Sequence, residues 1–527
     1  MNNTLQECYK YYVDLREDMN QWLKQSMALD PPGPNGGGED EANYALAWFP
    51  HYLVTGDKTV LKHFGDLKSA LAGWVERECL HGYEPEAEAH HGTEPFLLFL
   101  PRYIDLVPDD QEARSMLMDA AEHIGNWVEE IPAWYDYDRD TFCGYYIGSR
   151  TVHNDADTAY ELAEHFRFIH IALAAYRITG EERYLDWSLR YGQKRAERLI
   201  TAESPMPLLW DLDGNGLGEA EVEERNLHRI AAHSTHHLSS DPLAGIENLL
   251  ASGAIYALGD LYHLSGETAF KDAAKRIVEP LVESVLDPYH DPAAAAISYY
   301  RRTFQDTTFD QPLRAQLAAG MPPSPEHLAL IFPQEVRRRE HGVGRRADMA
   351  YWGEWSDDGS VQPIREPSTA AMTLAYQLSG NPEFATRAFR SASTRLKIAR
   401  RVLRGGREHA DMGGAVCSVA VGHGRNWGHG VVTSCYGPLL LGTREIQSAV
   451  VPMLEVRTEA GEHCLPQNLL SLLRPPMEGY GDVVFYNGSD STLSFSWRPK
   501  VKTDADSDWC DLQIESGKIE RVSLSQT

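Results

Sequence analysis

Residues 172–185 read ALAAYRITGEERYL, and this segment is the clearest indication of the fold class. A run of small and apolar residues ends at Gly180, an acidic residue follows, and a second helix-like pattern leads to Tyr184 and Leu185. Glycine suits the left-handed backbone conformation that commonly closes a helix. The stretch therefore predicts two helices joined by a tight glycine turn, which together make a helical hairpin.

The same pattern occurs three more times along the chain. The turns read Thr-Gly-Asp at 55–57, Ser-Gly-Glu at 265–267 and Ser-Gly-Asn at 379–381, each after a helix-like apolar run. The spacing between copies is irregular, which argues against a regular solenoid such as a tetratricopeptide array. A set of repeated hairpins in a chain of 527 residues predicts a mainly α protein with one large domain and a smaller one.

These helix ends, of the form (L/I)-(T/S)-G-(D/E)-x-x-(Y/F)-L, resemble the hairpins of (α/α) toroids in six-hairpin glycosidases and toroidal polysaccharide lyases. The resemblance implies a ring of inner and outer helices with the active-site funnel at one end. It points to an architecture and leaves the activity open, since the chain matches no catalytic signature of a named family. It also lacks the DDxxD run of toroidal terpene enzymes. We expect a catalytic toroid over residues 1–445.

After Pro438 the pattern changes to short, strand-like runs. Residues 483–486 and 492–497 flank a turn region with Asn-Gly, and two further runs follow at 512–514 and 519–522. Regularly spaced short strands favour a sandwich. We therefore predict a small β-sandwich-like domain over residues 446–527.

The net charge of −28 argues against nucleic acid as a partner, because phosphate would be repelled overall. The charge is uneven, however, because residues 299–425 hold 18 Lys and Arg against 13 Asp and Glu. Nearly all of these bases are Arg, which suits bidentate recognition of a carboxylate or sulfate. The other interpretation is a set of solvated helix faces with ion pairs.

Other compositional features concern the compartment. The cysteines, seven in number, are scattered and form no CxxC pair, so neither a zinc ribbon nor a disulfide framework is indicated. Residues 1–17 show no signal-peptide pattern, and no apolar run approaches the length of a membrane span. We expect a cytoplasmic protein that does not enter a membrane, or a secreted or periplasmic one if a leader has been removed.

The motif HNDAD begins at His153, just ahead of the quoted hairpin. Asn154, Asp155 or Asp157 could cap the helix that follows, because such side chains accept hydrogen bonds from unpaired backbone N–H groups. In the functional interpretation the N-terminus of that helix faces a cleft. His153 and Asp155 are then candidate catalytic residues, and Asn154 is a candidate for substrate binding.

A second candidate is the segment YYRRT, which contains Tyr300 and Arg301. In β-elimination a cation neutralises the carboxylate of a uronic acid, a base such as Tyr or His removes the C5 proton, and a proton reaches the leaving oxygen. Tyr300 is a candidate proton carrier and Arg301 a candidate carboxylate ligand. The alternative is an amphipathic strand or turn with exposed arginines.

Two further segments mix aromatic and polar residues. In YWGEWSDDG, Trp352 and Trp355 could line sugar subsites, with Glu354 as an acid. The run GHGRNWGHG has four glycines that let the backbone approach a ligand closely. Its candidate substrate-binding residues are Arg425, Asn426, Trp427 and His429.

Two segments raise the question of a metal. Asp211, Asp213 and Asn215 match the start of an EF-hand-type loop, but Val222 stands where that loop needs Glu. A structural calcium and a plain Asp/Asn/Gly turn both remain open. His236 lies in a cluster of histidines whose spacing on a helix would suit a zinc site. The alternatives are a catalytic or uronate-facing histidine and a cluster exposed at the surface. We expect no required cofactor.

Three functions fit these patterns. The first is a polysaccharide lyase acting by β-elimination on a uronic-acid-containing poly- or oligosaccharide. The second is a glycoside hydrolase on the same toroid, which needs two carboxylates facing across the sugar, such as Asp155 or Asp157 with Glu354. The third is a non-catalytic carbohydrate-binding toroid. Convergent polar loops favour an enzyme, and the expected partner is an acidic carbohydrate.

Overall fold

The structure of the protein is a computed structural model. The residues that the structure describes are 2–28, 48–86, 93, 96, 99–231, 242–285, 292–320, 328–331, 351–355, 357–358, 361–363, 369–400, 436–437, 444–446, 449–451, 454–458, 461–462, 465–477, 480–499 and 508–524.

Helices make up most of the described chain, so the predicted mainly α class is confirmed. They are α1 (Asn2–Met27), α3 (Trp48–Thr55), α4 (Lys58–Glu78), α6 (Leu100–Leu106), α7 (Gln111–Ala121), α8 (Phe166–Thr179), α9 (Glu182–Thr201), α10 (Glu219–Glu224), α11 (His228–Ala231), α12 (Ala244–Ala251), α13 (Ala254–Ser265), α14 (Thr268–Val278), α15 (Pro292–Thr303), α16 (Asp310–Gly320), α18 (Thr369–Ser379) and α19 (Pro382–Ala399), with the 3-10 helices η2 (Ala163–His165) and η3 (Glu279–Ser284).

The four predicted glycine turns are confirmed, and we call them corners. Gly56, Gly180, Gly266 and Gly380 have φ between 62° and 74°, and each donates its N–H to the carbonyl of a tyrosine four residues earlier. In every corner the preceding Thr or Ser hydroxyl donates to the carbonyl four residues back. The same hydroxyl accepts the N–H of the residue after the glycine. One short sequence therefore satisfies the helix end and starts the next helix each time.

The two helices of a hairpin differ in burial. In α8, the ten residues Phe166–Ala175 are all buried, and α13 and α18 show similar buried runs. The helices that follow them, α9, α14 and α19, have one buried face and one face of half-buried and exposed residues. A helix that is apolar all round is buried on every side, whereas an amphipathic helix lies at the surface. The first helix of each hairpin is therefore the inner one.

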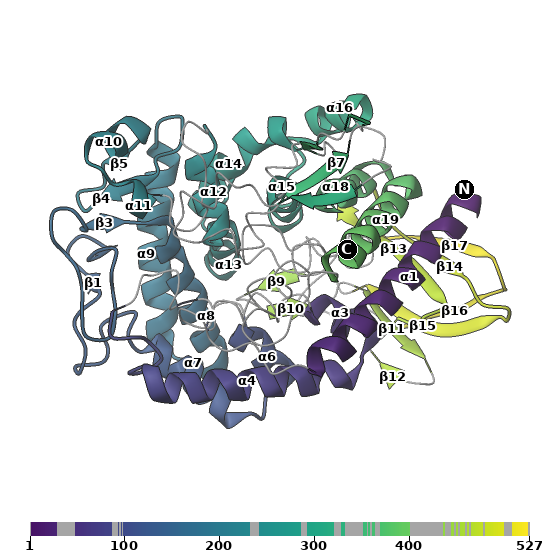
Figure 1. The fold of residues 1–527 in the computed structure, drawn as a ribbon, viewed down its shortest axis with the longest axis horizontal. Helices are drawn as coiled ribbons and strands as arrows, with labels where there is room; N and C mark the ends of the chain where they lie inside the picture. The colour runs from purple at the N-terminus through teal and green to yellow at the C-terminus, as the bar shows by residue number, and fades with distance from the viewer. Residues whose placement is uncertain are drawn as a thin grey trace.

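The helices contact one another in an order that returns to its start. From α1 the contacts run to α19, α18, α15, then α13 and α14, then α8 and α9, then α7, then α6 and α4, and finally α3. Helix α3 meets α1 again, where Trp22 and Trp48 have ring centroids 4.1 Å apart. In Figure 1 these helices surround the strands β9 (Arg444–Ile446) and β10 (Ala449–Val451), and β9 contacts α13 while β10 contacts α6.

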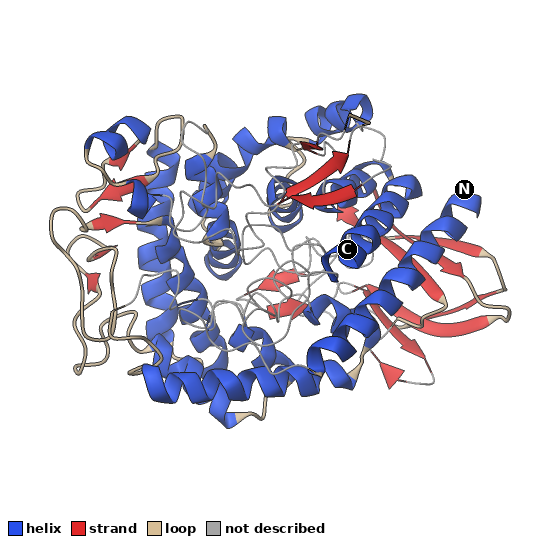
Figure 2. Ribbon diagram, viewed as in Figure 1, coloured by secondary structure: helices blue, strands red, loops and turns tan. Residues whose placement is uncertain are grey.

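Most strands gather after the helices, at the C-terminal end of the chain (Figure 2). All of the described pairings are antiparallel. The strands of the two C-terminal sheets are β11 (Leu454–Thr458), β12 (Gly461–Glu462), β13 (Leu469–Met477), β14 (Tyr480–Asn487), β15 (Leu493–Pro499), β16 (Cys510–Ile514) and β17 (Ile519–Ser523), in the orders β12-β11-β15-β16 and β13-β14-β17.

The C-terminal sheets share their core with the helices. The ring of Phe485 in β14 lies 5.2 Å from that of Phe495 and 5.6 Å from that of Trp497, both in β15 of the other sheet. The apolar cluster that contains these rings continues into α1 and α18. The small antiparallel sheets agree with the predicted change of pattern, and they are joined to the helical part by one continuous core.

Smaller strands sit between the helices. They are β1 (Tyr135–Asp136), β2 (Thr141–Phe142), β3 (Tyr160–Glu161), β4 (Leu209–Asp211), β5 (Gly216–Leu217), β6 (Leu328–Ile331), β7 (Tyr351–Trp355) and β8 (Val361–Pro363). Among the described helices, none combines the length and the apolar character that crossing a membrane requires.

Candidate functional site

The HNDAD motif does not start a helix, so the predicted capping role is wrong. Helix α8 begins only at Phe166, and residues 153–158 form a loop in which Asp155 and Asp157 are exposed. Between loop and helix the chain forms β3, which pairs with β4. The carbonyl of Asp155 instead accepts the N–H groups of Thr158 and Ala159. A strand pairing from a distant part of the chain has overridden the local capping preference.

The loop brings His153 beside an aromatic ring and a carboxylate. The His153 Nε2 lies 3.5 Å from the Glu86 Oε1, and the rings of Tyr146 and His153 have centroids 4.9 Å apart. The backbone N–H of His153 donates to the carbonyl of Tyr146 at 2.9 Å. The side chains of His153 and Glu86 remain 32% and 55% exposed, so this group faces solvent. We call the loop of residues 144–158 the rim loop.

Backbone hydrogen bonds hold the rim loop against the segment that follows α4. The N–H of Ser149 donates to the Glu84 carbonyl, and those of Arg150 and Thr151 donate to the Pro85 carbonyl, all at 2.9–3.0 Å. A Cβ on Gly148 would come within 2.5 Å of that Pro85 carbonyl oxygen. The close approach needs glycine there, and it sets the position of His153 relative to Glu86.

The carboxyl groups of this segment were missed by the sequence analysis. Glu84 is partly buried, and this burial, together with the charge of Glu78, raises the pKa of its carboxyl. Glu84 and Glu86 sit in the short motif YEPE, in a stretch without any helical or strand period. The paired acids around a proline were the only available signal.

A second polar group lies among the inner helices. Arg102 of α6 and Arg167 and His170 of α8 are all buried, and the Arg167 Nη1 donates to the Thr93 Oγ1 at 3.5 Å. The His170 Nε2 lies 2.9 Å from the Gly253 carbonyl, so this nitrogen carries the proton. Burial and the two nearby arginines lower the pKa of His170 to about 4. These residues were missed as well, although charged residues inside an apolar helical run were a usable signal.

Tyr300 and Arg301 do not join either group, which corrects their predicted roles. Both lie buried in helix α15, where neither an exposed turn nor a strand is formed. The Tyr300 hydroxyl donates to the Asp306 Oδ2 at 2.9 Å. The Arg301 guanidinium donates twice to Asp310, with distances of 2.5 and 2.7 Å. These contacts hold α15 to the start of α16, so both residues serve the packing of the fold.

The predicted Trp352–Trp355 loop is a strand. These residues belong to β7, in which Glu354 pairs with Leu328 on one side and Gln362 on the other. The flanking aromatic residues of this strand pair with Leu330 and Val361. A three-stranded sheet of β6, β7 and β8 therefore carries this candidate subsite. In Figure 1, β7 lies near α16 and α18, on the opposite side of the view from β3, which follows the rim loop in the chain.

The predicted calcium segment forms the tight β4–β5 turn. Asp211 accepts the backbone N–H and the side-chain amide of Asn215, both at 2.8 Å, and Asp213 lies 4.0 Å from Arg139. Within the described part of the chain, no group of three or more His, Cys, Asp or Glu side chains is placed to hold a metal ion. The hydrogen bonds match the plain turn interpretation.

Several predicted residues lie outside the described ranges. They are His236, Arg425, Asn426, Trp427 and His429. Their roles stay predictions.

Comparison of the chain with protein-family models, with curated proteins and with solved structures found no match.

Proposed function

We propose that this protein is a polysaccharide lyase that cleaves a uronic-acid-containing chain by β-elimination, built on an (α/α) toroid. The closed order of helix contacts and the alternation of inner and outer helices support the toroid. Because helices alternate in direction along a hairpin chain, the short corners gather at one end and the long connections at the other. The rim loop belongs to one of these long connections, the one that joins α7 to the inner helix α8.

The observation that carries the proposal is the pairing of His153 with Tyr146 on the rim loop. An imidazole, a phenol and an exposed arginine, Arg150, come from one loop whose backbone is held in place by the residues after α4. These are the side-chain types that β-elimination uses, and their partial exposure leaves them accessible to a large substrate.

In this mechanism Arg150 binds the uronate carboxylate and makes the C5 proton more acidic. His153 acts as the base and takes that proton. The electron pair of the C5–H bond forms a C4–C5 double bond, and the bond from C4 to the glycosidic oxygen breaks. The Tyr146 hydroxyl gives its proton to the leaving oxygen, so the step needs no further reactant.

The test is an assay on a panel of uronic polysaccharides that follows ultraviolet absorbance and reducing ends together. A lyase produces both signals, because its product carries a conjugated double bond. Reducing ends without absorbance would identify a hydrolase, and the absence of both would refute the proposal.

The variant His153→Ala should lower kcat at least about 100-fold, which is the usual contribution of a general base. The matched control is His263→Ala, since His263 is exposed near the corner end of α13. Equal activity of the two variants would remove His153 from the mechanism.

A glycoside hydrolase is the second candidate, and one observation favours it. Burial raises the pKa of the Glu84 carboxyl, which is the direction of shift that a general acid requires. For this reaction Glu84→Gln, rather than His153→Ala, should abolish the release of reducing ends.

A further inference from the structure

A small group of elements beside α9 has a core of its own. The strands β3, β4 and β5 and the helices α10 and α11 contact one another, and we call them the β3–α11 module. Most of their buried apolar side chains, among them Leu209, Leu217 and Val222, form a cluster of their own, while Trp210 of β4 belongs to the main core. Figure 1 shows the module at one side of the molecule, next to α9. A unit with a separate core can open without unfolding the rest.

One buried carboxylate joins this module to α9. Glu161 of β3 is fully buried and forms ion pairs with Arg195, at 3.0 Å, and with Arg198. The hydroxyl of Tyr191 donates to the same carboxylate at 2.8 Å. All three partners come from α9.

Both arginines form their buried ion pairs with this carboxylate, and the charges of Glu164 and Asp211 also act on Arg195 and Arg198, respectively. Arg195 is 1% exposed and Arg198 8% exposed, so neither guanidinium is well hydrated in the closed arrangement. A buried charge that loses its partner is strongly destabilised. Neutralising Glu161 would therefore favour any motion that lets water reach the arginines, and lifting the module off α9 is such a motion.

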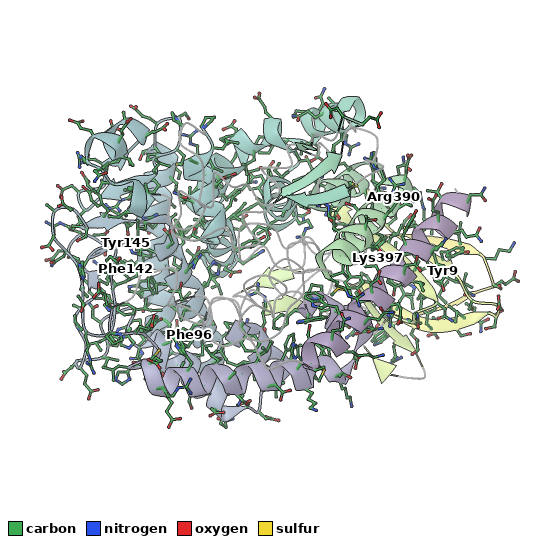
Figure 3. The ribbon with its side chains drawn as sticks, in the orientation of Figure 1. Tyr9, Phe96, Phe142, Tyr145, Arg390 and Lys397 are labelled. Atoms are coloured by element: carbon green, nitrogen blue, oxygen red, sulfur yellow. The ribbon has the colours of Figure 1, made fainter. Side chains whose placement is uncertain are left out.

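The module also covers part of the rim loop. Tyr145 is only 2% exposed because it belongs to the module's cluster, and Tyr146 packs against that cluster. Figure 3 labels Tyr145 beside Phe142 at this end of the molecule, far from Tyr9 and Lys397. The position of the module consequently sets the environment of the tyrosine that contacts His153.

We propose that Glu161 is a latch, and that the β3–α11 module opens from α9 as one unit and uncovers Tyr145 and Tyr146. The consequence for catalysis rests on the proposed function, because it concerns the ring beside His153. The opening itself does not, since it follows from the module's own apolar cluster and from the buried ion pairs of Glu161.

Hydrogen exchange of the full chain, followed by mass spectrometry without any substrate, tests the opening. In the wild type, amides of residues 209–231 should exchange together and faster than those of α9 and α13. In Glu161→Gln, exchange in the module should rise roughly 100-fold or more, while α13 and α14 keep their wild-type rates.

The matched control is Asp310→Asn, which breaks a comparable buried pair with Arg301 in another part of the ring. It should leave the exchange of the module unchanged. If Glu161→Gln does not fold, Tyr191→Phe removes only one hydrogen bond of the latch and should raise module exchange about fivefold.

Two results would overturn the inference: module amides in the wild type that exchange no faster than α9, or a Glu161→Gln variant that speeds exchange evenly over the chain. Neither result depends on lyase activity. Conversely, an inactive wild type with a module that opens as described would refute the proposed function and leave the latch intact.

Discussion

At the residue scale, close contacts between backbone atoms restrict the position of the rim loop. A Cβ on Gly144 would collide with the carbonyl oxygen of His153 and would lie 3.0 Å from that of Thr158. Backbone approaches backbone here, so a flexible side chain cannot move aside to relieve the clash.

Gly144→Ala should therefore destabilise the protein by about 1–3 kcal/mol and displace His153. The control is Gly65→Ala in α4, where an added Cβ meets nothing within 4 Å. That change should stabilise by up to about 1 kcal/mol through helix propensity. Urea unfolding measures both, and a Gly144→Ala variant as stable as the wild type would contradict the close approach.

A second feature at the residue scale is the position of His81 between two carboxylates. Its Nδ1 is 2.7 Å from Asp119 and its Nε2 is 3.1 Å from Glu130, and the ring of His123 lies 5.5 Å away. The hydrogen bond with Asp119, followed by that with Glu130, raises the pKa of His81 above its ordinary value.

Because the folded pKa is the higher one, the stabilisation is fully present below about pH 6.5 and is lost as pH rises through the folded pKa. The size should be about 0.2–1 kcal/mol, as for other partly exposed pairs. Thermal unfolding from pH 6 to 9 should show this loss in the wild type and a smaller loss in His81→Gln. Identical pH profiles would show that His81 does not contribute.

At the element scale, the corners show why the hairpins were predictable. Each corner is a local structure, since its hydroxyl and amide hydrogen bonds join residues no more than four apart. The glycine therefore adopts its left-handed backbone conformation without the help of a tertiary contact. The start of α8 was not predictable for the opposite reason, because β3 pairs with residues about fifty positions later.

Gly180→Ala should destabilise by about 1 kcal/mol, since φ is 71° there and no neighbour lies within 4 Å of an added Cβ. Gly180→Asn should cost less, because asparagine tolerates the left-handed region better. Chemical denaturation ranks the three proteins, and equal losses for Ala and Asn would mean that something other than backbone conformation sets the cost.

At the scale of the whole molecule, one buried histidine helps to close the circuit of helices. His51 of α3 has its Nε2 2.9 Å from the Asn20 Oδ1 of α1 and its Nδ1 2.9 Å from the Tyr436 hydroxyl. The amide oxygen accepts from Nε2, so Nδ1 accepts from the phenol. Burial, followed by the charge of Arg16, lowers the pKa of His51 to about 3, so the ring stays neutral near pH 7.

Tyr436→Phe should cost about 1–3 kcal/mol, because it leaves a buried ring nitrogen without its hydrogen bond. The control is Tyr52→Phe in α3, next to His51, since Tyr52 is only half-buried. This change should alter the free energy of unfolding by less than about 0.5 kcal/mol. Equilibrium unfolding compares them. Equal effects would mean that the bond to His51 contributes little.

In the candidate site too, some features follow from residues close together in the sequence, and others depend on contacts between distant segments. The motif around His153 stands out in the sequence because its polar residues precede an apolar helix. Its partner Glu86 does not, because the contact depends on how the loop after α4 meets the rim loop. Tyr300 and Arg301 show the reverse case: their residue types suggested chemistry, but acids six and nine positions further on bind them in the interior.

The mainly α class, the four corners and the change to strands near the C-terminus follow from the amino-acid sequence alone, because each depends on residues close together in the chain. The contacts between polar side chains depend on tertiary packing. A histidine, arginine or tyrosine becomes a site residue or a packing residue according to the partner that a distant segment brings to it, and burial then sets its charge and its exposure to water.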